Sequence, residues 1–170
     1  MSKEDKNIYQ IARESLNFTR AQAEEQMDFV SANRIEKIES GKSMPHPEEV
    51  LAMAKAYKTP GLCNAYCATE CPIGQKYVPA IEAKELPQIV LEMVNSINIV
   101  NEQKNRLISI AVDGKLTNDE FYDFAKIENE LEKISISVET LQLWLENTIE
   151  TGDVDETLLN SAREKVRGNI

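Results

Sequence analysis

Three cysteines occupy one short segment, "LCNAYCATECPIG", as Cys63, Cys67 and Cys71. Their spacing of four residues would place them in one stripe if the segment is helical. Three thiolates can hold zinc together with a fourth ligand, or three corners of an iron–sulfur cluster. The C-x-x-C pairs of ordinary zinc sites are missing, and the sole histidine, His46, is distant in the sequence. We therefore favour small buried residues that join two parts of the chain, with no cofactor, since unpaired cysteine is often interior. A metal- or redox-responsive site is the alternative.

A second group of polar side chains lies in "SANRIEKIESGKS", residues 31–43. An α-helix fits the major groove of DNA, and the side chains at its N-terminal end reach the base edges. The Asn33 side-chain amide can form two hydrogen bonds to adenine, and the Arg34 guanidinium can donate two hydrogen bonds to guanine or to a phosphate. We expect the following residues on or near DNA: Ser31, Ala32, Asn33, Arg34 and Lys37.

Further residues around this helix suit the DNA backbone. Thr19 and Arg20 stand where a preceding helix would begin, and the backbone N–H groups of a helix start favour phosphate. Lys42 and Ser43 follow the recognition helix and also suit phosphate contact. Three basic residues against two acidic ones give residues 31–43 a net charge of only +1, which is low for a DNA-binding segment.

Catalysis is not expected. The chain has one histidine, and it lacks a Gly-rich phosphate loop and a nucleophile elbow. Its many carboxylates fall mostly on the outer faces of expected helices, where they serve as a solvated surface.

Composition and charge narrow the possible functions. The 170 residues carry a net charge of −10, divided into −1 for residues 1–60 and −9 for residues 61–170. The acidic second part should repel a polyanion, so any DNA binding belongs to the first sixty residues. No apolar run approaches the roughly 20 residues that cross a bilayer, and "MSKEDKNIYQ" has no apolar signal region. We expect a cytoplasmic protein with reduced thiols and no membrane contact.

Apolar periodicity in the N-terminal part predicts four short helices. Thr19 and Ser31 suit the N-caps of the second and third, Gly41 a left-handed residue after the third, and Pro47 the first turn of the fourth. The expected inward-facing residues are Ile8, Ile11, Ala12, Ala23, Met27, Ile35, Ile38, Val50, Leu51, Met53, Ala54 and Tyr57.

The C-terminal part has a different pattern. Apolar residues follow 4-3 spacing from Leu86 and again from Phe124, with "DGKLT" between the two series. Such spacing is typical of a coiled-coil seam, and a short turn favours an antiparallel hairpin. The expected seam comprises Leu86, Val90, Met93, Ile97, Val100, Leu107 and Ala111, facing Phe124, Ile127, Leu131, Ile134, Val138, Leu141 and Leu145. Residues 151–170 suggest a last helix.

The N-terminal pattern resembles the Cro/cI-type (Xre-like) helix-turn-helix family of bacterial and phage regulators. The resemblance covers residues about 7–60. It depends on Ala12-Arg13, Thr19, Ser31, Ile35, Ile38-Glu39, Gly41-Lys42, Pro45 and the segment "EEVLAMAKAY".

The resemblance also implies a structural role for two charged residues. It makes Arg13 and Glu39 an ion pair between the first and third helices, without base contact. The chain departs from the commonest family spacing by one additional residue between Thr19 and Ser31, which falls in the turn "MDFVS". Insertions are tolerated in such turns, although this one can change the angle between the two helices.

We therefore expect an all-α protein with a lambda-repressor-like helix-turn-helix domain followed by a long antiparallel helical hairpin. The expected division is residues 1–60 for DNA binding, residues 61–85 as a Cys-containing connector, and residues 86–170 for the hairpin and dimerisation. The expected function is a sequence-specific transcriptional regulator that binds a double-stranded operator as a homodimer. The alternatives are a protein-interaction module whose helix-turn-helix is a docking surface, and a metal- or redox-responsive regulator.

Overall fold

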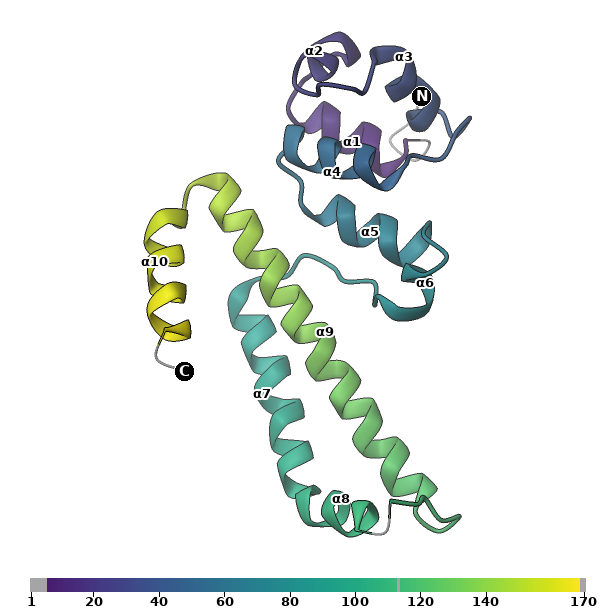
Figure 1. The fold of residues 1–170 in the computed structure, drawn as a ribbon, viewed down its shortest axis with the longest axis vertical. Coiled ribbons are helices and arrows are strands. Elements are labelled where there is room, and N and C mark those ends of the chain that lie inside the picture. Colours follow the sequence, from purple (N-terminus) through teal and green to yellow (C-terminus); the bar gives the residue numbers. More distant parts are fainter. Residues whose placement is uncertain (1–5, 113, 169–170) are drawn as a thin grey trace. The chain divides into compact units, whose positions relative to one another are not determined.

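The computed structural model describes residues 6–112 and 114–168, and within them the chain is helical without any strand (Figure 1). This confirms the all-α fold class. The chain divides into two compact units, one of residues up to Ala80 together with those from Leu145 onward, the other of residues Ile81–Trp144. No helix in the described ranges is long and apolar enough to span a membrane. The helices are α1 (Ile8–Ser15), α2 (Arg20–Glu25), α3 (Ala32–Glu39), α4 (Pro47–Ala56), α5 (Gly61–Thr69), α6 (Gly74–Tyr77), α7 (Leu86–Glu102), α8 (Lys104–Ala111), α9 (Phe121–Thr151) and α10 (Glu156–Arg167).

Local capping sets the ends of the first four helices. The Thr19 hydroxyl accepts from the Gln22 backbone N–H at 3.2 Å, and the Gln22 side chain accepts from the Thr19 N–H, which completes a capping box at the start of α2. Ser31 caps α3 by accepting from the Arg34 N–H. Gly41 ends α3 with a φ of +69°, and Pro47 opens α4, both as predicted.

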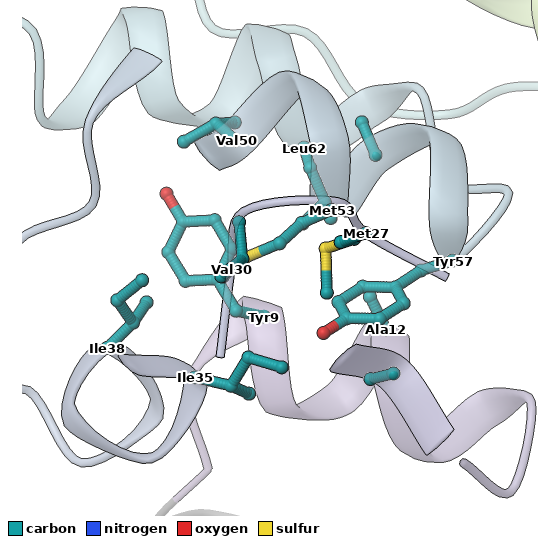
Figure 2. Packing of buried hydrophobic residues seen from close by; sticks show 12 residues of the cluster. Tyr9, Ala12, Met27, Val30, Ile35, Ile38, Val50, Met53, Tyr57 and Leu62 are labelled. Carbon is teal, nitrogen blue, oxygen red and sulfur yellow. The ribbon is translucent and has the colours of Figure 1, made fainter. Parts of the chain in front are cut away.

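The core of the N-terminal helices is one apolar cluster that extends from α1 to the start of α5 (Figure 2). Burial of an Ile, Val or Met side chain contributes about 1.5–3 kcal/mol to folding, so this cluster is the main source of stability for the domain. The cluster comprises Tyr9, Ala12, Ala23, Met27, Val30, Ile35, Ile38, Val50, Met53, Ala54, Tyr57 and Leu62.

Two predicted core positions in α1 are wrong. Ile8 and Ile11 are exposed, whereas Tyr9 and Arg13 lie inside with Ala12. The Tyr9 hydroxyl donates to Glu70 Oε1 at 2.9 Å, so a residue 61 positions away helps to set the inward face of α1.

Leu51 in α4 was also predicted to be buried, but 61% of it is exposed. The inward face of α4 passes through Val50, Met53 and Ala54, which places Leu51 on the side of the helix towards α5 and the cysteines. The connector contains the helix α5, and the chain after it forms the single turn α6 before an extended stretch.

The unit of residues 81–144 contains the predicted hairpin. Helix α7 runs antiparallel to the first part of α9, and α8 lies at the closed end (Figure 1). The Arg106 Nε in α8 donates to Asp123 Oδ2 at 2.6 Å, which fixes α8 to the start of α9. The Ser96 hydroxyl on α7 and the Lys133 ammonium on α9 both hydrogen bond to the Glu130 carboxylate, with Lys133 contributing most, and they lower the pKa of Glu130.

The residues that pack inside this hairpin agree with the predicted seam at Ile127 and differ from it at other positions. Val90, Ile97, Leu131 and Val138 are 40–47% exposed. Small and polar side chains are among those that take their place in the interior, and hydrophobic spacing alone does not mark them. The buried residues of the two helices are Ile89, Ser96, Ile127, Glu130, Ser137, Thr140 and Leu143.

Candidate nucleic-acid interface

The turn between α2 and α3 accommodates the additional residue of this sequence. Met27 and Val30 point into the core, and Asp28 and Phe29 between them are exposed. The two buried residues hold the ends of the turn, so the additional length is taken up at its tip. Helices α2 and α3 consequently still pack on each other and on one core.

The outer face of α3 is polar and open. Asn33, Glu36, Lys37 and Ser40 are exposed, while Ile35 and Ile38 on the opposite side are buried. Asn33 and Lys37 are one turn apart, and Glu36 lies between them on the same face. The predicted residues Ser31 and Ala32, at the start of the helix, are exposed and half-buried respectively.

Glu36 was not among the predicted contact residues. Its carboxylate can accept a hydrogen bond from the amino group of cytosine in the major groove. Exposure between Asn33 and Lys37 therefore gives this face an amide, a carboxylate and an ammonium. Together, these three groups can distinguish adenine, cytosine and guanine.

Arg34 occupies a position that the sequence did not indicate. Its Nε donates to Glu49 Oε1 at 2.7 Å and its Nη2 to Glu49 Oε2 at 2.7 Å, a bidentate ion pair between α3 and α4. Its Nη2 also donates to the Met44 carbonyl, and its Nη1 to the Ser43 hydroxyl. Most N–H donors of the Arg34 guanidinium, which was expected to contact DNA, are thus occupied by protein acceptors.

Glu49 is the buried partner of this pair. The hydrogen bonds from Arg34 are the main cause that lowers the pKa of Glu49, and a backbone hydrogen bond from His46 at 2.7 Å adds to them. The same pairing raises the pKa of Arg34. No sequence signal links two charges 15 residues apart in different helices, so only the structure finds this contact.

A second ion pair fixes α3 to α1. The Arg13 Nε donates to Glu39 Oε1 at 2.6 Å and the Arg13 Nη2 to Glu39 Oε2 at 3.0 Å, with both residues buried. The Arg20 Nε adds a bond of 2.8 Å to Glu39 Oε2, which connects α2 to the same carboxylate. Hydrogen bonding to Glu39 is the main cause that raises the pKa of Arg13. Helix α3 is therefore held at its inner side by two buried carboxylates, Glu39 and Glu49.

The residues predicted to contact phosphate are distributed around this unit. Thr19 and Lys42 are exposed. Arg20 retains 39% of its side-chain exposure while it pairs with Glu39. Ser43 is half-buried because its hydroxyl serves Arg34.

The three cysteines are free thiols and half-buried. In the parts of the chain that the structure describes, no group of three or more histidine, cysteine or acidic side chains is placed to hold a metal ion. His46 is exposed and precedes α4.

Five short helices around one core, with a capped α2–turn–α3 and a polar outer face on α3, define a helix-turn-helix DNA-binding domain. Residues 10–61 match the family described as helix-turn-helix, of the Xre/lambda-repressor type. This match supports a family of DNA-binding transcription regulators for the N-terminal domain. No curated protein and no solved structure matches the chain.

Proposed function

We propose that this protein is a sequence-specific regulator of transcription that binds double-stranded DNA as a homodimer. The observation that carries the proposal is the outer face of α3, which presents Asn33, Glu36 and Lys37 while ion pairs fix the inner side of the helix. A recognition helix fixed in this way can hold base-reading groups in one orientation before DNA arrives.

The three exposed groups of α3 read the bases in this proposal. Asn33 pairs with adenine, Glu36 accepts from cytosine, and Lys37 donates to guanine or to a phosphate. Thr19, Arg20, Lys42 and Ser43 contact the backbone and set the register. Arg34 fixes α3 to α4 through its ion pair with Glu49, and it contributes to DNA binding by holding α3 in place.

Selection from a pool of random duplexes tests the proposal. We expect one preferred sequence, whose affinity falls as salt rises. Asn33→Ala should weaken binding to this sequence by about 1–3 kcal/mol and relax the preference at one base. Lys55→Ala, on the exposed side of α4, is the control and should bind as the wild type does. Failure to select any sequence contradicts the proposal.

The exposed apolar residues of the hairpin support dimerisation. Val90, Val94 and Ile97 follow helical spacing on α7, and Leu131 and Val138 lie seven residues apart on α9; all five are exposed. Four of them, Val90, Ile97, Leu131 and Val138, belong to the predicted 4-3 seam, and the single chain leaves them exposed. A second copy that packs on them would bury an apolar stripe of the kind used in coiled coils.

Light scattering at micromolar concentration tests this part of the proposal. The wild type should have the mass of two chains, and Ile97→Glu should have the mass of one. Asn98→Glu introduces the same charge at an adjacent exposed position and should remain a dimer. A monomeric wild type contradicts the proposed assembly, because two-fold symmetry is then unavailable for a palindromic site.

One observation favours a second candidate function. Arg34 is paired with Glu49, and this ion pair reduces the positive charge that residues 31–43 can offer to phosphate. A domain of this shape could instead dock on another protein. A duplex selection without a preferred sequence, together with a folded domain, would favour this docking function.

A further inference from the structure

All three cysteines line one apolar pocket between α4 and α5. The pocket has a volume of about 210 Å³ and opens to solvent, and no charged side chain contributes to its wall. Water occupies about 30 Å³ per molecule, so this space suits one small organic molecule. The lining residues are Pro47, Val50, Leu51, Cys63, Tyr66, Cys67 and Cys71.

The three thiols differ in their surroundings. Burial is the main cause that raises the pKa of Cys63, so this thiol remains protonated and weakly nucleophilic. Cys71 lies beyond the end of α5, and its Sγ accepts a hydrogen bond from the Gly74 backbone N–H at 3.5 Å. This donor holds the sulfur in one orientation at the pocket wall. The geometry therefore favours Cys71 over Cys63 as the nucleophile.

The short helix α6 holds this N–H in place. Gly74 is buried against α5, where an added Cβ would overlap the carbonyl oxygen of Cys67. The Gln75 N–H donates to the Cys71 carbonyl at 2.8 Å, which fixes the backbone of Cys71 as well as its sulfur. Cys71 is thus held at the pocket wall by backbone contacts on both sides.

We propose that this pocket binds a small, uncharged, soft electrophile, such as a quinone or an α,β-unsaturated carbonyl compound, and that Cys71 adds to it. The apolar wall selects against charged molecules, because burial of an ionised group without a partner is costly. The cysteine thiols that line the pocket place a nucleophile next to any soft electrophile bound there.

The addition needs no oxidant and no further co-reactant. The Cys71 thiolate forms a C–S bond to the β-carbon, and the π-electron pair of the C=C bond moves to the carbonyl as an enolate. The proton lost by the thiol returns from water to the α-carbon. The product is a thioether, and no group leaves.

The position of the pocket connects it to α3. Pro47 and Val50, on its wall, flank Glu49, which holds Arg34. An adduct that displaces the first turn of α4 would therefore weaken the Arg34–Glu49 ion pair. This consequence rests on the proposed DNA-binding function, whereas the pocket itself does not.

Labelling of the full chain with two matched probes tests the proposal. N-ethylmaleimide is small and neutral, and maleimidopropionate has the same reactive ring with a carboxylate on its side chain. Peptide mass spectrometry follows the rate at each cysteine. We expect Cys71 to react first in the folded protein and to prefer the neutral probe by roughly tenfold, since a carboxylate is excluded from an apolar site. In urea the preference should vanish and the three thiols should react alike.

Two variants of α4 make the test specific to the pocket. Leu51→Glu introduces a carboxylate at the exposed pocket wall, which repels the charged probe, and should raise the preference for the neutral probe at Cys71 above that of the wild type. Lys55→Glu introduces the same group one turn further along α4, outside the lining residues, and should retain the preference. Equal rates of the two probes at Cys71 in the folded wild type overturn the proposal, as does faster labelling of Cys63 or Cys67.

Binding of the selected duplex tests the consequence for α3 separately. Wild-type protein treated with N-ethylmaleimide should bind less tightly than Cys71→Ser protein treated in the same way. Equal affinities overturn the link between the pocket and α3. Absence of duplex binding by untreated protein would count against the proposed function, while the labelling result would still decide the pocket.

Discussion

Replacing Arg34 with alanine removes four hydrogen bonds from the contact between α3 and α4. Loss of one partner from a fully buried ion pair costs about 3–5 kcal/mol, because the other charge stays buried. The Arg34 side chain is 22% exposed and that of Glu49 is 11% exposed, and the His46 N–H still reaches Glu49. We therefore expect a smaller cost, about 2–3 kcal/mol, to the opening free energy of the domain.

Hydrogen exchange at the buried amides of Ile35 and Met53 measures this cost. A loss of 2–3 kcal/mol corresponds to exchange that is roughly 30–150 times faster, since about 1.4 kcal/mol is a factor of ten. Glu49→Leu added to Arg34→Ala should recover part of the loss, because an uncharged residue no longer needs a partner. Exchange in Arg34→Ala within twofold of the wild type would refute the structural role assigned to this ion pair.

The effect should also depend on pH. The pKa of Glu49 is lower in the folded protein than in the unfolded chain, with Arg34 as the main cause. Its stabilising contribution is therefore present above the unfolded pKa of about 4.3 and is lost as the pH falls through the folded pKa. The difference between wild type and Arg34→Ala should be largest near pH 7 and should shrink below about pH 4. A difference that stays constant across this range would contradict the assigned cause.

Three further predictions concern other contacts of the N-terminal helices. Glu39→Gln should destabilise the domain by about 2 kcal/mol, since it weakens buried pairing with Arg13, whereas Glu36→Gln on the exposed face should leave thermal unfolding unchanged. Gly41→Ala should cost about 1 kcal/mol because its φ is +69°, and Gly41→Asn should cost less; chemical denaturation compares the two. Gly74→Ala should displace α6 from α5, with faster exchange of the Gln75 amide as the measure, and exchange like the wild type would refute the close packing.

Local signals in the sequence were enough to predict the helix-turn-helix. Thr19 and Ser31 cap helices through contacts within three residues, and Gly41 and Pro47 act on the backbone at their own positions. Such features need no knowledge of the tertiary fold. The resemblance to the family then supplied the pairing of Arg13 with a distant glutamate, and the two side chains are hydrogen bonded in the structure.

The remaining features depend on contacts between distant residues. Arg34 looks like a base-reading residue by its place in α3, and only its contact with Glu49 shows that most of its donors are occupied. The interior of the hairpin contains Ser96, Ser137 and Thr140, and the hydroxyls of the last two donate to carbonyls of their own helix. Apolar spacing therefore identified Ile127 of the buried face, together with positions such as Val90 and Leu131 that are exposed.

The cysteine pocket shows the same limit. Sequence spacing placed three thiols in one stripe, but it could not indicate that α4 covers them with Val50 and Leu51. The thiols were expected to be buried, and they are half-buried around a space of their own.

The ion pairs that hold α3 also bear on how the protein would search a genome. Arg13 is paired with Glu39 and Arg34 with Glu49, so these arginines attract DNA of arbitrary sequence only weakly. The remainder of the chain, from residue 61 onward, adds a net charge of −9. Because binding to non-specific DNA is almost entirely electrostatic, we expect short residence on non-target sites and few long slides along the duplex. Such a protein would reach its operator mainly by repeated diffusion through solution, and its occupancy there would depend on base contacts more than on ionic strength.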